Sequence, residues 1–294
     1  MFALFPFHPG VARFNMQTLT QLSIGLAAAV LCGMTSAQSA PIGEIKGTGW
    51  QHTAESLAAA VRQANTVVPA KFNGGTLFVG KFENLPKLSG GKIPVVVFLH
   101  GSSGLGLAAI GEWQNWLADL GFASVAPDSF ALADHVTYKS PIDKITYERI
   151  HAMRGSEIAP MLDALKAQFW VNTNHLILAG TSEGSVPVAR YKGTEFAARM
   201  LYSWSCETNY FVIEPQNAFE ANKPVLNVIS STDPFFSPSN TWLGNPAAKG
   251  HCGAALKENK QAAVVLVPDA PHTLLNFPAA RHATAGFLAS VVKP

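Results

Sequence analysis

Charge and cysteine are scarce in this chain. Only 14% of its 294 residues are charged, whereas 48% are hydrophobic, and Lys and Arg form no cluster. The lack of a basic cluster argues against a surface for nucleic acid or anionic lipid. A chain this long and this apolar can bury a large core, so it needs no metal or disulfide framework to fold.

Metal-binding patterns are missing as well. The nine histidines include no pair spaced for one helix face, and the three cysteines form no CxxC motif, so we predict no metal site. Cys32 lies in the leader described next. The other two, Cys206 and Cys252, are predicted either to close a disulfide in an oxidising compartment or to stay as buried thiols.

The first 40 residues contain no Lys, Asp or Glu, unlike the rest of the chain. Their apolar run at 22–33 is too short to span a bilayer comfortably, and small residues suited to cleavage follow near Ala37 or Ala40. We therefore interpret residues 1–40 as a signal peptide, with a retained N-terminal anchor as the alternative. The mature protein is expected to be periplasmic or secreted, without stable membrane insertion.

No linker, charge block or repeat divides residues 41–294, which predicts a single domain. Short apolar runs alternate with stretches of helical spacing, as in βαβ units. The run IPVVVFL at 93–99 is typical of a strand covered on both faces of a parallel sheet. Strands are predicted at 93–99, 123–126, 176–179, 200–204, 225–229 and 263–267, with an antiparallel edge strand at 76–82.

Helices are predicted at 112–120, 156–168, 183–192 and 279–292, and each would cover a face of the sheet. Ser156, followed by Glu157, is predicted to cap the second of these helices. The connection 234–260 is long and contains Pro, Asn and Gly, so it is expected to border a pocket. The predicted fold class is α/β, with a doubly wound, mostly parallel sheet flanked by helices.

The pentapeptide GTSEG at 180–184 follows a predicted strand and precedes a predicted helix. This G-x-S-x-G pattern is typical of a nucleophile elbow, in which glycines flank a serine held in a strained turn. A side chain at either glycine position would crowd the neighbouring backbone. The helix that begins beside Ser182 would favour the negative charge that develops during acyl transfer.

Asp233 and His272 each come just after a predicted strand, which gives the chain order Ser, Asp, His that this architecture requires. Open α/β sheets bind ligands at the carboxyl ends of their strands, so these side chains are expected to meet. His272 is the predicted base that takes the proton of Ser182, and Asp233 would orient the imidazole. Asp269 and Glu207 are the weaker alternatives for the acid.

The segment HGSSG at 100–104 follows the most apolar strand and is predicted to form an oxyanion loop. Its donor would be the backbone N–H of Ser102. The N–H of Glu183, the residue after the nucleophile, would be the second donor.

Five segments, VVVFLHGSSGLG, GFASVAPDSF, LILAGTSEG, the strand ending in STD, and DAPHT, together resemble the dienelactone-hydrolase-like branch of the α/β-hydrolase superfamily. The resemblance extends over residues 70–292. It implies the α/β-hydrolase fold, no cofactor, and hydrolysis of small or medium esters or lactones through an acyl-enzyme. Founding members have a cysteine at Ser182, an acidic residue at Gly101 and an arginine at Asn276, so dienelactone is not the expected substrate.

Other side chains are assigned to the pocket or to the surface. Arg149, Arg154 and Glu157 are expected to pair on a solvated helix face, with an ion-pair cluster flanking the cleft as the alternative. Six aromatic residues after strands or in the long connection are expected near the pocket mouth, where some of them shape an apolar acyl pocket: Trp204, Tyr210, Phe211, Phe235, Phe236 and Trp242.

The sequence thus predicts an exported serine hydrolase that acts on small-molecule carboxylic esters, with no nucleic-acid partner and no particular oligomeric state. A peptidase or an acyltransferase with the same three residues is the alternative among enzymes, because pocket shape and water access select the leaving group and the acceptor. A non-catalytic binding protein on the same scaffold is the alternative outside them.

Overall fold

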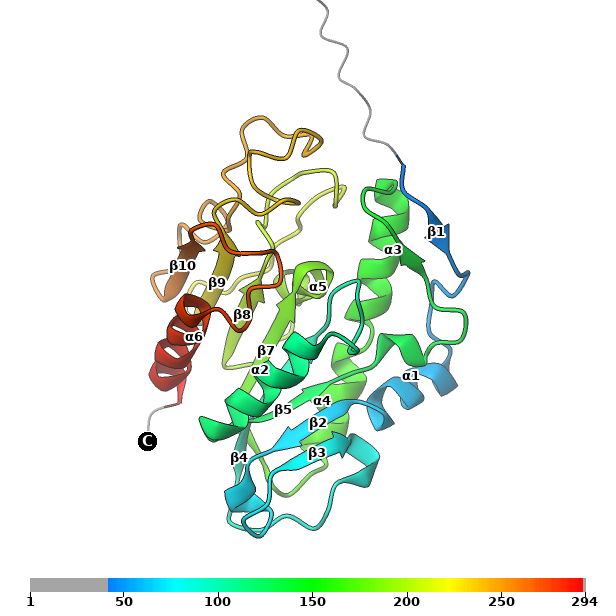
Figure 1. Ribbon diagram of the computed structural model, residues 1–294. Helices are drawn as coiled ribbons and strands as arrows, with labels where there is room; N and C mark the ends of the chain where they lie inside the picture. The colour runs from blue at the N-terminus through cyan, green and yellow to red at the C-terminus, as the bar shows by residue number, and fades with distance from the viewer. Residues whose placement is uncertain (1–41, 293–294) are drawn as a thin grey trace, which may run out of the picture. The chain divides into compact units, whose positions relative to one another are not determined.

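The computed structural model describes residues 42–292 of the chain (Figure 1). The signal peptide predicted for residues 1–40 lies outside these described residues. Within residues 42–292, no helix combines the length and the apolar character needed to cross a membrane.

Eight strands form one sheet in the order β10-β9-β8-β7-β4-β5-β2-β3. The six strands from β10 to β5 are parallel, whereas β2 and β3 are antiparallel at one edge. The six parallel strands and the antiparallel edge strand β3 are confirmed, whereas β2, which lies between β5 and β3, is not among the predicted strands. The strands are β2 Asn65–Val68, β3 Phe78–Lys81, β4 Ile93–Leu99, β5 Ala123–Ala126, β7 Val171–Thr181, β8 Ala198–Tyr202, β9 Val225–Ser230 and β10 Ala262–Val267.

The central strand β4 has the predicted bounds and is buried on both faces. Its side chains alternate between two hydrophobic clusters, because successive residues of a strand point to opposite faces of the sheet. Val95 and Val97 enter one cluster, and Val96 and Phe98 enter the other. The near-continuous apolar run is therefore explained by layers of helices on both sides.

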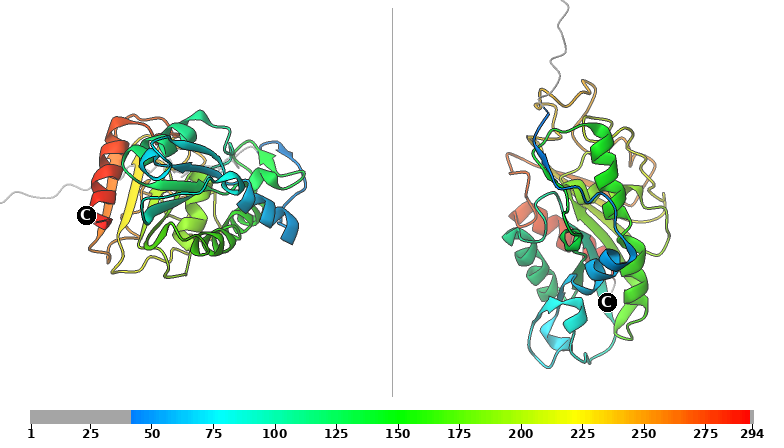
Figure 2. Two further views of the ribbon diagram at one scale, coloured as in Figure 1. Left: turned by 90° about the horizontal axis from the view of Figure 1, so that it is seen from below. Right: turned by 90° about the vertical axis from the view of Figure 1, so that its right-hand side faces the viewer.

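Helices cover both faces of the sheet (Figures 1 and 2). Buried side chains of α2 and α6 belong to one cluster, and those of α3, α4 and α5 belong to the other. The short helix α1 packs against α4. The helices are α1 Ala54–Arg62, α2 Ala108–Asp119, α3 Lys144–Gly155, α4 Ile158–Lys166, α5 Ser185–Arg190 and α6 Pro278–Val291.

The structure differs from the sequence prediction around α3. This helix was not predicted, because its buried face includes the polar residues His151 and Arg154, which weaken the apolar periodicity. The predicted N-cap role of Ser156 is wrong, since Ser156 ends α3. Helix α4 begins after Glu157, which makes no side-chain capping bond.

Two features lie beyond the sheet and border the site described below. Part of the long β9–β10 connection, drawn in yellow to orange, lies past the carboxyl ends of the strands (Figure 1). A separate two-stranded antiparallel sheet joins β1 (Ile45–Lys46) to β6 (Thr137–Tyr138). Tyr138 of β6 is one of the residues that line the cavity at this end of the molecule.

Candidate active site

Ser182 occupies a sharp turn between β7 and α5. Its φ of +52° lies in the left-handed region, which a residue with a side chain adopts only under constraint. A Cβ at Gly180 would lie 2.5 Å from the carbonyl oxygen of Gly184, and a Cβ at Gly184 would overlap that of Leu99. Only glycine fits at these two positions, so the G-x-S-x-G pattern follows from the close approach of backbone segments.

The structure brings Ser182, His272 and Asp233 together. Nε2 of His272 is 2.8 Å from Ser182 Oγ, and Nδ1 of His272 is 2.7 Å from Asp233 Oδ2. Because a carboxylate accepts hydrogen bonds, Nδ1 carries the hydrogen and Nε2 is left to accept the hydrogen bond from the serine hydroxyl. His272 is partly exposed at 19%, whereas the Asp233 side chain is fully buried.

Local hydrogen bonds hold the two residues that come from connections. The other carboxylate oxygen of Asp233 accepts from the backbone N–H groups of Phe235 and Phe236, at 2.9 and 3.1 Å. The hydroxyl of Ser203 donates to the carbonyl oxygen of His272 at 2.5 Å. The ring of Phe235 meets the imidazole edge to face, with centroids 4.6 Å apart. Each side chain is thus fixed from more than one direction.

The alternative acids have other places in the structure. The Glu207 carboxylate accepts hydrogen bonds from the N–H groups of Lys249 and Gly250, at 2.7 and 2.9 Å. Asp269 lies in the turn after β10 with a φ of +49°. Asp233 is the carboxylate in contact with His272.

A cavity of about 280 Å³ opens beside Ser182. Of the six predicted aromatic residues, four line it, while Trp204 and Trp242 pack behind them against Phe236 and Tyr210. Sequence reasoning missed Tyr138 and several other residues of the wall, which no motif marks. The lining residues are Gly101, Ser102, Ser103, Gly104, Leu107, Ile110, Tyr138, Ser140, Thr181, Ser182, Tyr210, Phe211, Phe235, Phe236, His272 and Thr273.

The predicted oxyanion loop lies against the elbow. A Cβ at Gly101 would be 3.3 Å from the Cβ of Ser182, so the two segments are in close contact. Ser102 is exposed at the cavity wall, and its N–H has no protein acceptor within residues 42–292. Glu183 directly follows Ser182 in the 3-10 turn Ser182–Gly184. The roles of the Ser102 and Glu183 N–H groups as donors stay predictions.

The predicted surface pairing of Arg149, Arg154 and Glu157 is wrong. Arg154, in the last turn of α3, is only 2% exposed, and its guanidinium forms an ion pair with the fully buried carboxylate of Glu183. Glu157 is buried as well and accepts a hydrogen bond from His52 Nε2 at 2.9 Å. Helix α3 turns polar side chains inward because their partners lie on segments far away in the sequence, which helical periodicity does not reveal.

The Arg154 guanidinium also contacts residues of the segments that follow β4 and β5. Its Nη1 donates to Ser129 Oγ at 2.6 Å and lies 3.1 Å from the ring nitrogens of His100. Its Nη2 donates to the carbonyl oxygen of Gly101 at 3.3 Å. One side chain therefore reaches the segments that follow β4, β5 and β7.

Two partners in this network keep their neutral forms. Burial, together with the charge of Arg154, lowers the pKa of His100 well below its usual value, so the imidazole is neutral beside the guanidinium. Burial and the nearby charge of Glu183 raise the pKa of Tyr138 well above its usual value. The Tyr138 hydroxyl therefore keeps its proton and donates it in a hydrogen bond to Glu183.

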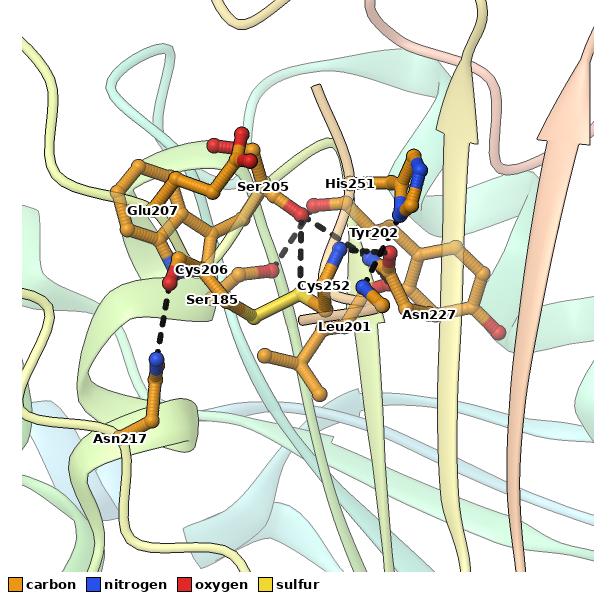
Figure 3. Close-up of a disulfide and its surroundings, with 12 residues drawn as sticks. Ser185, Leu201, Tyr202, Ser205, Cys206, Glu207, Asn217, Asn227, His251 and Cys252 are labelled. Atoms are coloured by element: carbon orange, nitrogen blue, oxygen red, sulfur yellow. Dashed lines mark hydrogen bonds between the residues drawn. A yellow bond between two sulfur atoms is a disulfide. The ribbon is translucent and has the colours of Figure 1, made fainter. Parts of the chain in front are cut away.

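The structure joins Cys206 and Cys252 by a disulfide (Figure 3). The N–H of Cys252 donates to Asn227 Oδ1 at 3.0 Å, and Asn227 Nδ2 donates to the carbonyl oxygens of Leu201 and Trp204. The disulfide thus fastens the connection that begins near Asp233 to the segment that follows β8. Among residues 42–292, no group of three or more His, Cys, Asp or Glu side chains is arranged to hold a metal ion.

Comparison with known proteins gives structural matches. No family model and no curated protein matches the sequence. A cold-adapted esterase from an Arctic intertidal metagenomic library is 15% identical, with a TM-score of 0.50, and covers 79% of this chain and 95% of that one. Est1E from Butyrivibrio proteoclasticus is 17% identical over 79% and 94%, with a TM-score of 0.48. A dienelactone hydrolase-like protein from Klebsiella pneumoniae is 17% identical over 71% and 90%, with a TM-score of 0.49.

At sequence identities of 15–17%, the similarity to these structures shows a shared fold and no more. The mostly parallel sheet, the helices on both of its faces and the match to the Arctic esterase define the class: this chain has the α/β-hydrolase fold. Fold alone does not fix an activity, which has to be argued from the side chains of the site.

Proposed function

We propose that this protein is a serine hydrolase that cleaves small, uncharged carboxylic esters through an acyl-enzyme on Ser182. The observation that carries the proposal is the chain of hydrogen bonds from Ser182 Oγ at the cavity wall through His272 to the buried Asp233. A serine hydroxyl becomes an effective nucleophile when a base removes its proton during attack. His272 is this base, and Asp233 orients its imidazole.

The proposed reaction has two halves. Ser182 Oγ attacks the ester carbonyl while its proton passes to His272 Nε2, and the N–H groups of Ser102 and Glu183 stabilise the oxyanion. The tetrahedral intermediate collapses, and the leaving alcohol takes the proton from Nε2. Water then attacks the acyl group in the same way, giving its proton to His272, and the carboxylic acid leaves as Ser182 regains its hydrogen.

The chemistry of the cavity wall supports an uncharged substrate. The described residues that line the cavity include no Asp, Glu, Lys or Arg, and aromatic and aliphatic side chains form much of the wall. Asn276, which replaces the arginine of the resemblance, is not part of the lining and donates instead to Ala109 and Glu112. An ionised substrate would lose its hydration here without gaining a counter-charge.

We also propose that the chain is exported after removal of residues 1–40. The apolar leader and the small residues near Ala37 and Ala40 support this. The Cys206–Cys252 disulfide supports it as well, because disulfides persist mainly in oxidising compartments.

Intact-mass measurement after reaction with a fluorophosphonate probe tests both proposals at once. The full chain is expressed in a bacterium with its own first 40 residues. We expect one adduct on the wild type, none on Ser182→Ala with an unchanged circular dichroism spectrum, and a mass that begins just after residue 37 or 40. Labelling that persists in Ser182→Ala contradicts the nucleophile, and a mass that includes the leader contradicts processing.

A substrate panel then separates the proposed esterase from its alternatives. We expect turnover of nitrophenyl acetate and butyrate and little turnover of the matching nitroanilides. Preferred cleavage of the anilides would favour a peptidase, and transfer of the acyl group to an added alcohol in preference to water would favour an acyltransferase. A labelled protein that turns over nothing would favour a binding role.

A further inference from the structure

We infer that Arg154 is a positioning residue that sets the relative placement of the two halves of the oxyanion hole, an inference that rests on the proposed function. Ser102 follows β4, whereas Glu183 follows β7. Their N–H groups stabilise one developing oxyanion only if both lie about 3 Å from the same oxygen. A shift of one segment against the other would spoil this geometry without touching the nucleophile.

One guanidinium contacts both segments directly. Arg154 Nε donates to the Glu183 carboxylate, and Nη2 donates at 3.3 Å to the carbonyl oxygen of Gly101, which directly precedes Ser102. The planar fork of arginine fixes the directions of its N–H groups, so a single side chain determines where both acceptors lie. Lysine has no such fork and could satisfy only one of these segments with good geometry.

The guanidinium is itself fixed in place. Ser129 Oγ accepts from Nη1 at 2.6 Å, and the neutral ring of His100 lies 3.1 Å away. A hydrogen on His100 Nδ1 suits both neighbours, since Nδ1 then donates to Gly101 O at 2.8 Å and Nε2 accepts from the N–H of Ser129. These contacts leave Arg154 little freedom to move inside the core.

Stabilisation of the fold does not by itself explain why Arg154 and Glu183 form a buried ion pair here. Desolvation of two charges offsets most of their attraction, and apolar residues of similar size often stabilise a fold equally well. The Arg154–Glu183 pair is instead placed where it affects the cavity. Glu183 accepts a hydrogen bond from Tyr138, whose ring lines the wall, and follows Ser182 in the chain.

The test compares Arg154→Lys with Arg199→Lys. Arg199 is a matched control because it is also buried, at 5% exposed, but lies near the amino end of β8, away from the site. For Arg154→Lys we expect kcat for a nitrophenyl ester to fall by about 10- to 100-fold with KM within about twofold, because the interaction is made in the transition state. Affinity for a trifluoromethyl ketone, whose hemiketal carries the oxyanion, should fall by the same factor.

A second variant separates positioning from folding. Arg154→Met combined with Glu183→Met removes both charges and leaves neither unpaired, so we expect it to fold with a melting temperature near that of the wild type. Its kcat and ketone affinity should still fall. Wild-type kcat and ketone affinity in either variant overturn the inference, as does an equal loss in Arg199→Lys. The proposed function is judged separately, by fluorophosphonate labelling of Ser182 in the unmodified protein.

Discussion

The two sides of the cavity are held in place by different kinds of interaction. The nucleophile side holds the proposed nucleophile Ser182, which is fixed by the turn between β7 and α5 and is followed in the chain by Glu183, the buried partner of Arg154. The acid–base side holds the proposed acid and base, Asp233 and His272, on the connections after β9 and β10. Backbone N–H groups and hydroxyls hold these two residues, and a disulfide fastens the longer connection.

Because the two sides are held differently, a single substitution has different consequences on each of them. On the nucleophile side, the regular geometry of a strand and a helix places Ser182. The Arg154–Glu183 ion pair then adjusts the position of the residues next to it. Connections have no such regular geometry, so local hydrogen bonds and a covalent link must supply it. On the acid–base side, chemistry and scaffold can therefore be altered independently, and the first two predictions use this.

Asp233→Asn is expected to have the largest effect, because it changes the chemistry of the acid–base side and keeps the scaffold. The asparagine oxygen can still accept from the N–H groups of Phe235 and Phe236, which turns its NH₂ group toward His272. The imidazole then takes the wrong tautomer, with its hydrogen on Nε2. We expect kcat for a nitrophenyl ester to fall by about 10⁴-fold, with little change in melting temperature.

Glu207→Gln is the matched control for this substitution. It neutralises the alternative acid, and its amide oxygen can still accept from the N–H groups of Lys249 or Gly250. We expect its kcat to stay within about twofold of the wild type, since surface substitutions away from the chemistry have small effects. A collapse of activity in Glu207→Gln beside a fully active Asp233→Asn would reverse the assignment of the acid.

Much of the fold could be predicted from the sequence. β4 and β5 were predicted at their observed bounds, because an apolar run that is covered on both faces needs no partner information. Ser182, Asp233 and His272 could be placed at strand ends because each comes just after a predicted strand. Their order in the chain then indicated their roles. Their meeting could be predicted as well, because parallel strands have their carboxyl ends at one edge of the sheet. The sheet order adds that β8 separates β7 from β9 and β10.

The buried polar network could not be predicted. Arg154 has partners 25 or more residues away in the chain, and its helix α3 lacks a clean apolar stripe because polar side chains share the buried face. Ser156 followed by Glu157 has the pattern of an N-cap, but it ends α3, a helix that the local sequence does not reveal. In each case a long-range contact outweighed the local pattern.

Removal of the disulfide is expected to have the next largest effect, because it weakens the scaffold of the acid–base side and keeps its chemistry. Cys206 and Cys252 are 46 residues apart, and closing a loop of that length lowers the free energy of folding by about 4 kcal/mol through the entropy of the unfolded chain. The Cys206→Ser, Cys252→Ser double variant should lose about that much free energy of unfolding in urea titrations. Its kcat should fall less than tenfold.

Reduction provides the control for this variant. Dithiothreitol should lower the urea midpoint of the wild type to that of the double variant and leave the double variant unchanged. An equal response of both proteins to dithiothreitol would show that the two cysteines are unpaired in solution.

The smallest effect is expected on the nucleophile side, where acid should weaken the support given by α3. His151 lies one turn before Arg154 and packs against Phe211 of the cavity wall, with ring centroids 4.8 Å apart. Among the described residues, neither ring nitrogen has a hydrogen-bond partner, although a Glu148 carboxylate oxygen lies 3.9 Å from Nδ1. Burial lowers the pKa of His151 below its usual value of 6.5, so the folded protein keeps this imidazole neutral.

This depressed pKa fixes the direction of the pH dependence. Below pH 6.5 the unfolded chain binds a proton at His151, whereas the folded protein keeps the imidazole neutral. The contribution of His151 to the free energy of unfolding is therefore complete above that pH and is lost as the pH falls. His151→Phe removes the effect, and urea titrations from pH 7 to pH 5 should show a slope shallower by up to about 1.4 kcal/mol per pH unit. His282→Gln, at an exposed position of α6, should keep the wild-type slope. Parallel slopes for His151→Phe and the wild type would instead show that the acid sensitivity comes from groups other than His151.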